Sequence, residues 1–139
     1  MIASLPEMDK SRRIVFLGTP DFALPTLRML KEQGYNVVGV CTQPDKPVGR
    51  KQVLQPTPVK KLALSYGLPV VQVKKIREEE GVAALKQLRP DLMITAAFGQ
   101  ILSQEVLDVP ALGCINVHGS LLPKYRGAAP IQQAVIDGE

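Results

Sequence analysis

The sequence is poor in the residues that build metal sites and disulfide frameworks. It has one histidine and two cysteines, and Cys41 and Cys114 lie far apart in separate apolar runs. That spacing favours two buried free thiols in a reducing cytoplasm and gives no metal-binding motif. No hydrophobic run approaches the length of a transmembrane helix. The opening stretch contains acidic residues and lacks the apolar segment of a signal peptide, so we expect residues 1–11 to form a flexible extension.

The remaining composition indicates one soluble globular domain. The chain has 139 residues, of which 45% are hydrophobic, and its mean hydropathy is +0.06. This length supports a single domain with a substantial core. The composition excludes both an intrinsically disordered chain and a membrane-spanning one.

The formal net charge is +4, and the basic excess is concentrated in one region. Residues 43–61 carry five basic side chains against one acidic side chain, which accounts for the whole net charge. The basic residues are Lys46, Arg50, Lys51, Lys60 and Lys61, and the acidic one is Asp45. Such a local excess favours an anionic partner, whereas an ordinary solvated loop is the alternative reading of the same charges.

Apolar runs alternate with segments of helical spacing along most of the chain. Buried strands are predicted at residues 13–17, 37–42, 70–71 and 91–97, and a fifth begins at Cys114. Helices are predicted between residue 21 and Gly34, from Pro58 to Gly67, over 78–88 and over 131–136. The pattern predicts an α/β fold with a doubly wound, mostly parallel, Rossmann-like sheet. Because the last element stops at the chain end, we expect the domain to be truncated.

The first strand is followed by the turn Gly18-Thr19-Pro20-Asp21. We expect Thr19 or Asp21 to cap the next helix, with Pro25 tolerated in its first turn. A strand followed by glycine and a helix resembles a dinucleotide-binding unit, but no GxGxxG is present. The turn has too few glycines to hold a pyrophosphate, so we exclude this function.

Residues 43–57 contain three prolines and much of the basic excess, and we expect a long exposed loop there. Loops of this length in a compact α/β unit are usually functional or disordered. A second candidate segment is 114–130, CINVHGSLLPKYRGAAP. Asn116 and His118 are two apart at the end of a strand, so their side chains would share one face. An amide and an imidazole there would be suited to stabilising an oxyanion and moving a proton, although a structural Asn–His pair is the commoner arrangement.

The run NVHGSLLPKYRGAAP resembles the signature of enzymes that transfer a formyl group from 10-formyltetrahydrofolate. RIVFLGTPDFA and CTQPDKPVGR resemble the first strand and the second-strand loop of the methionyl-tRNA formyltransferase family. The similarity runs from Arg12 to Glu139. It implies formyl transfer to the α-amine of initiator methionyl-tRNA during translation initiation, by a monomeric cytoplasmic enzyme that uses no metal.

The resemblance also implies roles for individual residues. Asn116 and His118 would be catalytic. The folate co-substrate would contact two segments, and the tRNA would contact the proline-rich loop. The folate residues are Phe98, Gly99, Gln100, Ile101, Leu102, Ser120, Leu121, Leu122 and Pro123, and the tRNA residues are Lys46, Arg50 and Lys51. For Phe98, Ile101 and Leu102, a plain core position is an equally good reading of the sequence. Lys124 and Arg126 could hold the loop or an anionic group.

The family's third catalytic residue is an aspartate in a later segment, and nothing in the sequence matches it. We therefore expect that aspartate, and a C-terminal RNA-binding β-domain, to lie beyond Glu139, and the 139-residue chain to be inactive alone. One rival hypothesis changes the acceptor to an amino sugar or purine precursor, or makes the chain a formyltetrahydrofolate hydrolase. Another makes it a non-catalytic nucleic-acid-binding module. The basic proline-rich loop argues against the first rival, because a small acceptor does not need it. Mutation of His118 would test the second rival, because a non-catalytic module does not depend on that residue.

Overall fold

The structure is a computed structural model that describes residues 9–117. Five parallel strands form the central sheet, in the order β5-β2-β1-β6-β7. They are β1 (Arg13–Gly18), β2 (Asn36–Cys41), β5 (Val70–Val71), β6 (Leu92–Ala96) and β7 (Cys114–Asn116). The predicted parallel sheet is therefore confirmed, and each strand lies within a residue or two of its expected position. Residues 1–8 and the predicted helix over 131–136 lie outside the described part of the chain.

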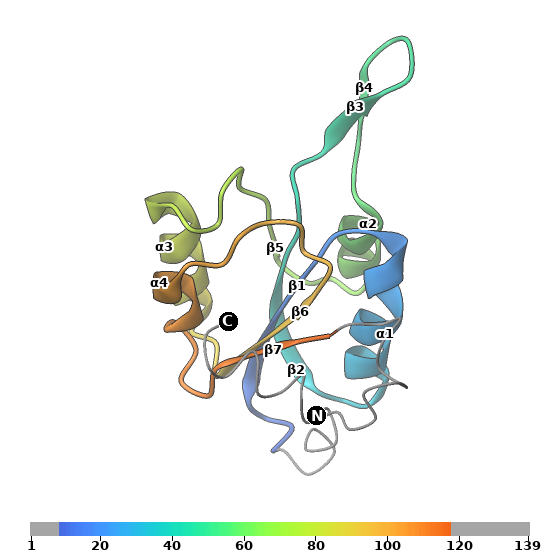
Figure 1. Ribbon diagram of the computed structural model, residues 1–139. Coiled ribbons are helices and arrows are strands. Elements are labelled where there is room, and N and C mark those ends of the chain that lie inside the picture. Colours follow the sequence, from blue (N-terminus) through green and yellow to red (C-terminus); the bar gives the residue numbers. More distant parts are fainter. Residues whose placement is uncertain (1–8, 118–139) are drawn as a thin grey trace.

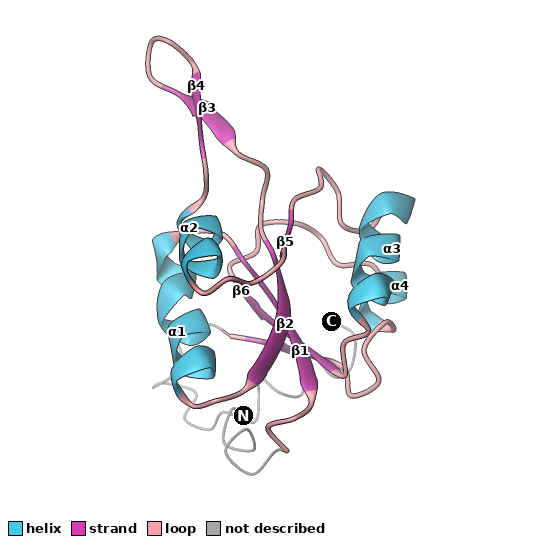
Figure 2. Ribbon diagram, turned by 180° about the vertical axis from the view of Figure 1, so that it is seen from behind, coloured by secondary structure: helices cyan, strands magenta, loops and turns pink. Residues whose placement is uncertain are grey.

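Helices cover both faces of this sheet, as a doubly wound fold requires (Figure 1). A 3₁₀ turn, η2 (Asp21–Ala23), leads into α1 (Leu24–Glu32), and both lie with α2 (Pro58–Ser65) on one face. The other face carries α3 (Glu79–Leu88) and the short α4 (Gln104–Leu107). The view from behind in Figure 2 shows the same two helical layers on either side of the strands.

The apolar run of β1 is explained by its position in the middle of the sheet. Ile14 and Phe16 pack against the layer of α1 and α2, whereas Val15 and Leu17 pack against the layer of α3 and α4. All four side chains are fully buried. Burial of each contributes roughly 1.5–3 kcal/mol, so a strand covered on both faces has no position for a polar side chain.

The start of α1 differs from the sequence prediction. Neither Thr19 nor Asp21 caps α1, whose N-cap is Ala23 without a side-chain hydrogen bond. The η2 turn intervenes and moves the start of the α-helix past both residues. By contrast, α2 begins with Pro58 and has Thr57 as its N-cap, where Thr57 Oγ1 accepts a 3.0 Å hydrogen bond from Lys60 N.

The segment 43–57 is not the irregular loop expected from its prolines. It contains an antiparallel hairpin of β3 (Lys46–Val48) and β4 (Val53–Gln55), with Val48 opposite Val53. Figure 1 shows this hairpin extending well away from the body of the fold. Pro47 is tolerated because, among the described residues, no further strand pairs with the two-stranded ribbon on which it lies.

Strand order places the topological switch point of the sheet between β1 and β6. β1 lies between β2 and β6, and the chain leaves β1 towards α1 on one face but reaches β6 from α3 on the other. Ligands of open α/β sheets bind outside the carboxyl ends of the strands where the connections diverge in this way. That end of the sheet carries the turn after β1, the turn after β6 and the base of the hairpin. Within residues 9–117, no helix is long and apolar enough to cross a membrane.

Candidate active site

Asn116 lies at the carboxyl end of β7, next to the end of β6. β7 pairs with β6 so that Asn116 is opposite Thr95. Thr95 Oγ1 donates a 3.0 Å hydrogen bond to Asn116 Oδ1, and Thr95 is only 5% exposed. The bond sets the amide oxygen towards β6, which fixes the orientation of the carboxamide. His118, the other predicted catalytic residue, lies outside the described residues, as do Ser120, Leu121, Leu122 and Pro123.

The turn that follows β6 has an unusual backbone. Ala97 has φ 54° and Gly99 has φ 89°, both in the left-handed region. Alanine there costs roughly 1–2 kcal/mol, and such strain is found preferentially at ligand-binding sites. The turn lies beside the end of β1, because Gly18 pairs with Ala96.

The predicted folate residues of this turn divide into buried and exposed positions. Phe98 is 5% exposed and belongs to the core between the sheet and α3 and α4, and Leu102 packs against that core. Ile101 is 68% exposed, and Gly99 is exposed as well. The alternative that Phe98 is a core residue thus agrees with its position, whereas Ile101 is available to a ligand.

Gln100 uses its side-chain amide within the protein. Its Nε2 donates to Val73 O at 2.9 Å and to Gln43 Oε1 at 2.8 Å, while its Oε1 accepts from Ile76 N at 2.6 Å. These bonds join the turn after β6 to the segment between β5 and α3 and to the end of β2. Gln100 therefore holds the turn in place, and its contact with the folate stays a prediction.

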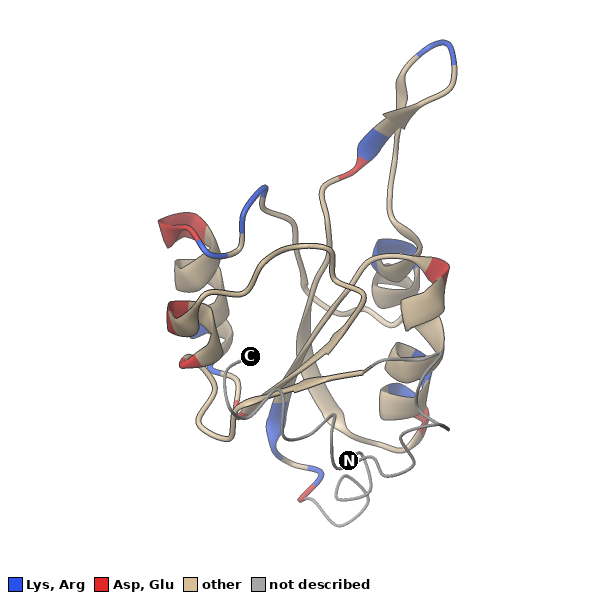
Figure 3. Ribbon diagram, in the orientation of Figure 1, with Lys and Arg blue, Asp and Glu red and all other residues tan. Residues whose placement is uncertain are grey.

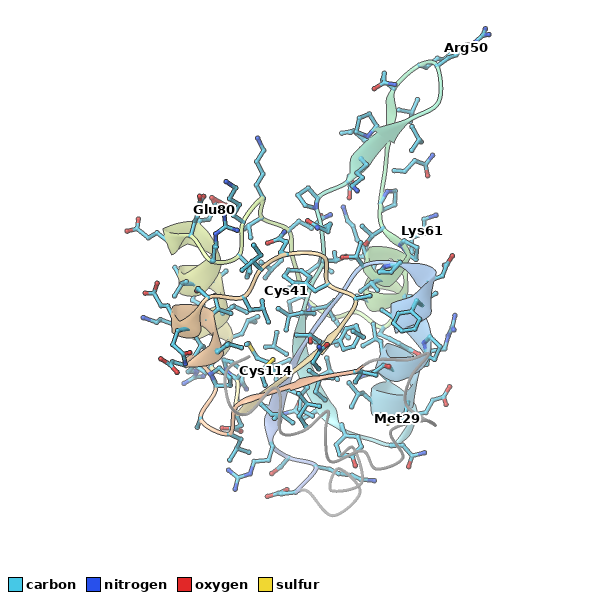
Figure 4. All side chains as sticks on the ribbon, in the orientation of Figure 1. Met29, Cys41, Arg50, Lys61, Glu80 and Cys114 are labelled. Carbon is cyan, nitrogen blue, oxygen red and sulfur yellow. The ribbon has the colours of Figure 1, made fainter. Side chains whose placement is uncertain are left out.

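The hairpin presents basic side chains to solvent. Lys46 lies on β3, and Arg50 and Lys51 lie in the loop at its tip, where Figure 4 shows Arg50 pointing away from the body of the protein. All three are exposed, and none forms an ion pair with another described residue. Val53 and Leu54, which are 55% and 63% exposed, add apolar surface to the same hairpin. A projecting surface of free cations and apolar side chains is suited to a polyanion that also offers apolar faces, as nucleic acids do.

The base of the hairpin is held by one ion pair. Lys60 Nζ on α2 lies 3.1 Å from Asp45 Oδ1, and Gln72 Nε2 donates to the same oxygen at 2.7 Å. The hydrogen bond from Gln72, followed by that from Lys60, holds the pKa of Asp45 below its usual value. Among the five basic residues of the segment 43–61, Lys60 is thus already paired, which leaves the cations nearer the tip for a ligand.

Basic residues continue along this end of the sheet. The loop between β5 and α3 carries Lys74 and Lys75, and Figure 3 shows its basic segment on the same side of the molecule as the hairpin. The acidic residues at the start of α3 lie farther out on the opposite helical layer (Figure 3). The candidate site is therefore flanked by positive charge on two sides, which favours an anionic ligand.

Neither cysteine takes part in this site. Cys41 and Cys114 are both free and buried, as the sequence predicted, and Figure 4 shows them among the interior side chains. Burial raises the pKa of each thiol to about 12, so both stay protonated at neutral pH and are poor nucleophiles. Within residues 9–117, no cluster of three or more histidine, cysteine or acidic side chains is arranged to hold a metal ion.

A separate depression of about 360 Å³ lies between α1 and α2. It is lined by Asp21, Leu24, Arg28, Pro58, Lys61, Leu62 and Ser65. Asp21 ends the turn after β1, and the other lining residues lie on α1 and α2; none of them is among the candidate site residues. The depression is thus distinct from the candidate active site.

Comparison with known proteins assigns the chain to a family. The family model described as "Formyl transferase" matches residues 12–139. The chain belongs to the formyl transferase family. The resemblance carried by the sequence motifs is confirmed at the level of this family.

Two curated relatives show which members of this family the chain resembles. The chain is 63% identical over 126 residues to a methionyl-tRNA formyltransferase of Lysinibacillus sphaericus, covering 91% of this chain and 40% of that protein. It is 59% identical over 127 residues to the methionyl-tRNA formyltransferase of Bacillus subtilis, with 91% and 40% covered. The chain thus spans about 40% of the length of these relatives.

A solved structure supports the fold alone. The phosphoribosylglycinamide formyltransferase of Anaplasma phagocytophilum superposes with a TM-score of 0.55 at 21% identity, covering 78% of this chain and 50% of that one. The Rossmann-like arrangement of the sheet is therefore shared with a second formyltransferase.

Sequence reasoning missed the polar residues that arrange this site. Thr19 donates from Oγ1 to Phe98 O at 2.8 Å and accepts from Gln43 N at 3.3 Å. Gln43 and Thr95 were not singled out either. The available signal was position, since Thr19 and Gln43 each stand one or two residues after the carboxyl end of a buried strand.

Proposed function

We propose that the chain forms part of an enzyme that transfers the formyl group of 10-formyltetrahydrofolate to the α-amine of initiator methionyl-tRNA in the cytoplasm. The observation that carries the proposal is the position of Asn116, at the carboxyl end of β7 and on the end of the sheet that also bears the basic hairpin. Membership of the formyl transferase family supports the reaction type. The names of the most similar curated relatives support the acceptor.

The proposed chemistry is an attack of the amine nitrogen on the formyl carbon. A carbon–nitrogen bond forms, the formyl oxygen takes up negative charge, and the N10–formyl bond of the folate then breaks. Asn116 and His118 would donate hydrogen bonds to that oxygen, and each such donor is worth roughly 3–4 kcal/mol in the transition state. The His118 imidazole would also move the proton that the attacking amine loses.

The two substrates are assigned to different parts of the chain. The folate would bind along Phe98, Gly99, Gln100, Ile101 and Leu102 and along 120–123. Within the first segment, Ile101 and Gly99 are the exposed positions, so they would meet the pterin, while Phe98 and Gln100 would hold the turn from behind. Lys46, Arg50 and Lys51 would contact tRNA phosphates, since they are exposed and carry no partner charge among the described residues.

Two substitutions in the full-length protein that carries this sequence test the proposal together. His118→Ala should abolish formyl transfer and leave tRNA affinity within about twofold, because the imidazole acts on the reacting atoms. Arg50→Ala should weaken tRNA binding and reduce the slope of log affinity against log salt by about 1. Lys86→Ala is the matched control, since Lys86 is an exposed cation on α3 outside the site and should leave both quantities unchanged.

The alternatives predict other outcomes in the same experiments. A non-catalytic nucleic-acid-binding module would lose affinity in Arg50→Ala and show no transfer even before His118 is changed. A formyltransferase for a small amine would formylate an amino sugar or purine precursor in preference to charged tRNA and would be insensitive to Arg50→Ala. The hairpin favours tRNA, because it extends far beyond the end of the sheet where a small acceptor would bind (Figure 1).

A further inference from the structure

One residue between β2 and the hairpin bonds to the segments that follow β1, β5 and β6. Gln43 N donates to Thr19 Oγ1 at 3.3 Å, and Gln43 O accepts from Gln72 Nε2 at 3.0 Å. Its side chain reaches the turn after β6, where Nε2 donates to Gly99 O at 2.9 Å and Oε1 accepts from Gln100 Nε2 at 2.8 Å. The backbone carbonyl of Gln43 is thus bonded at the base of the hairpin, whereas its side chain is bonded to the turn after β6.

The turn is built to admit this glutamine at close range. Gly99 has φ 89°, which favours glycine, and a Cβ added there would lie 2.8 Å from Gln43 Nε2, so the Gln43 amide would have to shift. Ala97 is strained as well, with φ 54°. A strained backbone persists only where its surroundings determine it. At this turn the fixing bonds come from Thr19 to Phe98 O, from Gln43 to Gly99 O, and from the side chain of Gln100 to its neighbours.

We propose that Gln43 is a positioning residue for the formyl donor: its side-chain amide holds the turn 97–101 in the conformation that accepts the folate. The inference rests on the proposed function, since it takes the turn after β6 as the folate-binding segment. It adds a residue to that site from a segment that otherwise serves the tRNA. Gln43 itself acts through Gly99 and Gln100, which lie between it and the exposed face of the turn.

A neighbouring glutamine provides a matched control. Gln72 also makes two side-chain hydrogen bonds, to Gln43 O and to Asp45 Oδ1, but it has none to the turn. Both of its acceptors lie at the base of the hairpin. Removing Gln72 should therefore loosen the hairpin, whereas removing the side chain of Gln43 should loosen the turn. The two changes cost the protein the same number of side-chain bonds.

The experiment compares Gln43→Ala, Gln43→Glu and Gln72→Ala in the full-length protein, with separate KM values for formyl donor and tRNA. Loss of one neutral hydrogen bond changes an equilibrium constant by about 2- to 12-fold, so Gln43→Ala, which loses both side-chain bonds, should raise donor KM by about 4- to 140-fold. Its kcat and tRNA KM should stay within about twofold. Gln43→Glu should also raise donor KM, because a carboxylate keeps the shape but has no hydrogen to donate to Gly99 O. Gln72→Ala should raise tRNA KM and leave donor KM within about twofold.

Three outcomes decide the matter. An unchanged donor KM in Gln43→Glu, or an equal rise of donor KM in Gln72→Ala, would overturn the inference while leaving the proposed function intact. Absence of formyl transfer in the unsubstituted protein would instead overturn the proposed function. If Gln43→Ala does not fold, as judged by its thermal transition, the isosteric Gln43→Glu still gives the answer.

Discussion

The hydrogen bond from Thr95 to Asn116 makes a quantitative prediction about catalysis. Thr95→Val removes the hydroxyl and keeps the branched shape in a position that is 5% exposed. Asn116 Oδ1 then loses the 3.0 Å bond that sets the orientation of its carboxamide. A neutral hydrogen bond is worth about 0.5–1.5 kcal/mol, so the correctly oriented amide should become about 2- to 12-fold less populated. kcat should fall by that factor, with both KM values unchanged.

The size of this effect separates orientation from chemistry. Asn116→Ala removes the hydrogen-bond donor itself and should lower kcat by about 10²- to 10³-fold. Because Thr95 acts through Asn116, the double variant should be no slower than Asn116→Ala alone. Thr95→Ser keeps the hydroxyl and should recover most of the kcat lost in Thr95→Val.

Steady-state formylation of charged tRNA, measured for the four variants alongside circular dichroism melts, provides the assay. The reasoning would be refuted if Thr95→Val lowered kcat by the same factor with and without Asn116, since the two residues would then act independently. It would also fail if Thr95→Val and Thr95→Ser had equal activity. A change confined to the melting temperature would assign the bond to stability alone.

Two further predictions concern stability. Cys41 and Cys114 should react with a thiol reagent only at the rate of unfolding. The unfolded thiols ionise near pH 9.0 and the folded ones near about 12. Over that range the free energy of unfolding, measured by urea titration, should therefore fall by about 1.4 kcal/mol per pH unit per thiol. Serine at both positions should abolish this pH dependence. Gly81→Ala should destabilise the protein by about 1–3 kcal/mol, since the added methyl group would overlap the backbone of Ile76, and a thermal melt that matches the unsubstituted protein would contradict the packing described for the start of α3.

The sheet was predictable from the sequence because its strands are buried on both faces. In the central strand β1, Ile14, Val15, Phe16 and Leu17 are all fully buried, which gives a continuous apolar run bounded by Arg13 and Gly18. The helices α1, α2 and α3 were predictable from spacing, and the first two also from a terminal glycine such as Gly34 after α1, whereas the short α4 (Gln104–Leu107) was not predicted. What could not be predicted was the start of α1, where the choice between a cap and a 3₁₀ turn depends on tertiary contacts.

The hairpin was missed for a related reason. Its pairing partners are exposed, so Val48 and Val53 lack the alternation of apolar and polar residues that marks a half-buried strand. The prolines at 44, 47 and 56 also argued against strands. The turn after β6 was identified only through the family resemblance, because Gln43 and Gly99 are 56 residues apart and no local pattern relates them.

The hairpin and the folate turn are held by neighbouring bonds, which bears on how the enzyme would handle two substrates of very different size. A two-stranded hairpin is marginally stable by itself, so its direction depends on the bonds at its base. Those bonds join Asp45 to Lys60 and to Gln72, and Gln72 in turn bonds to Gln43 O. Because the pKa of Asp45 is lowered, the carboxylate is charged at neutral pH, and its contribution to stability is lost only as the pH falls through the folded value. The side chain of Gln43 holds the turn after β6. Gln43, two residues after the end of β2, is therefore bonded to both proposed substrate-binding segments, through its backbone carbonyl to Gln72 at the hairpin base and through its side chain to the turn after β6.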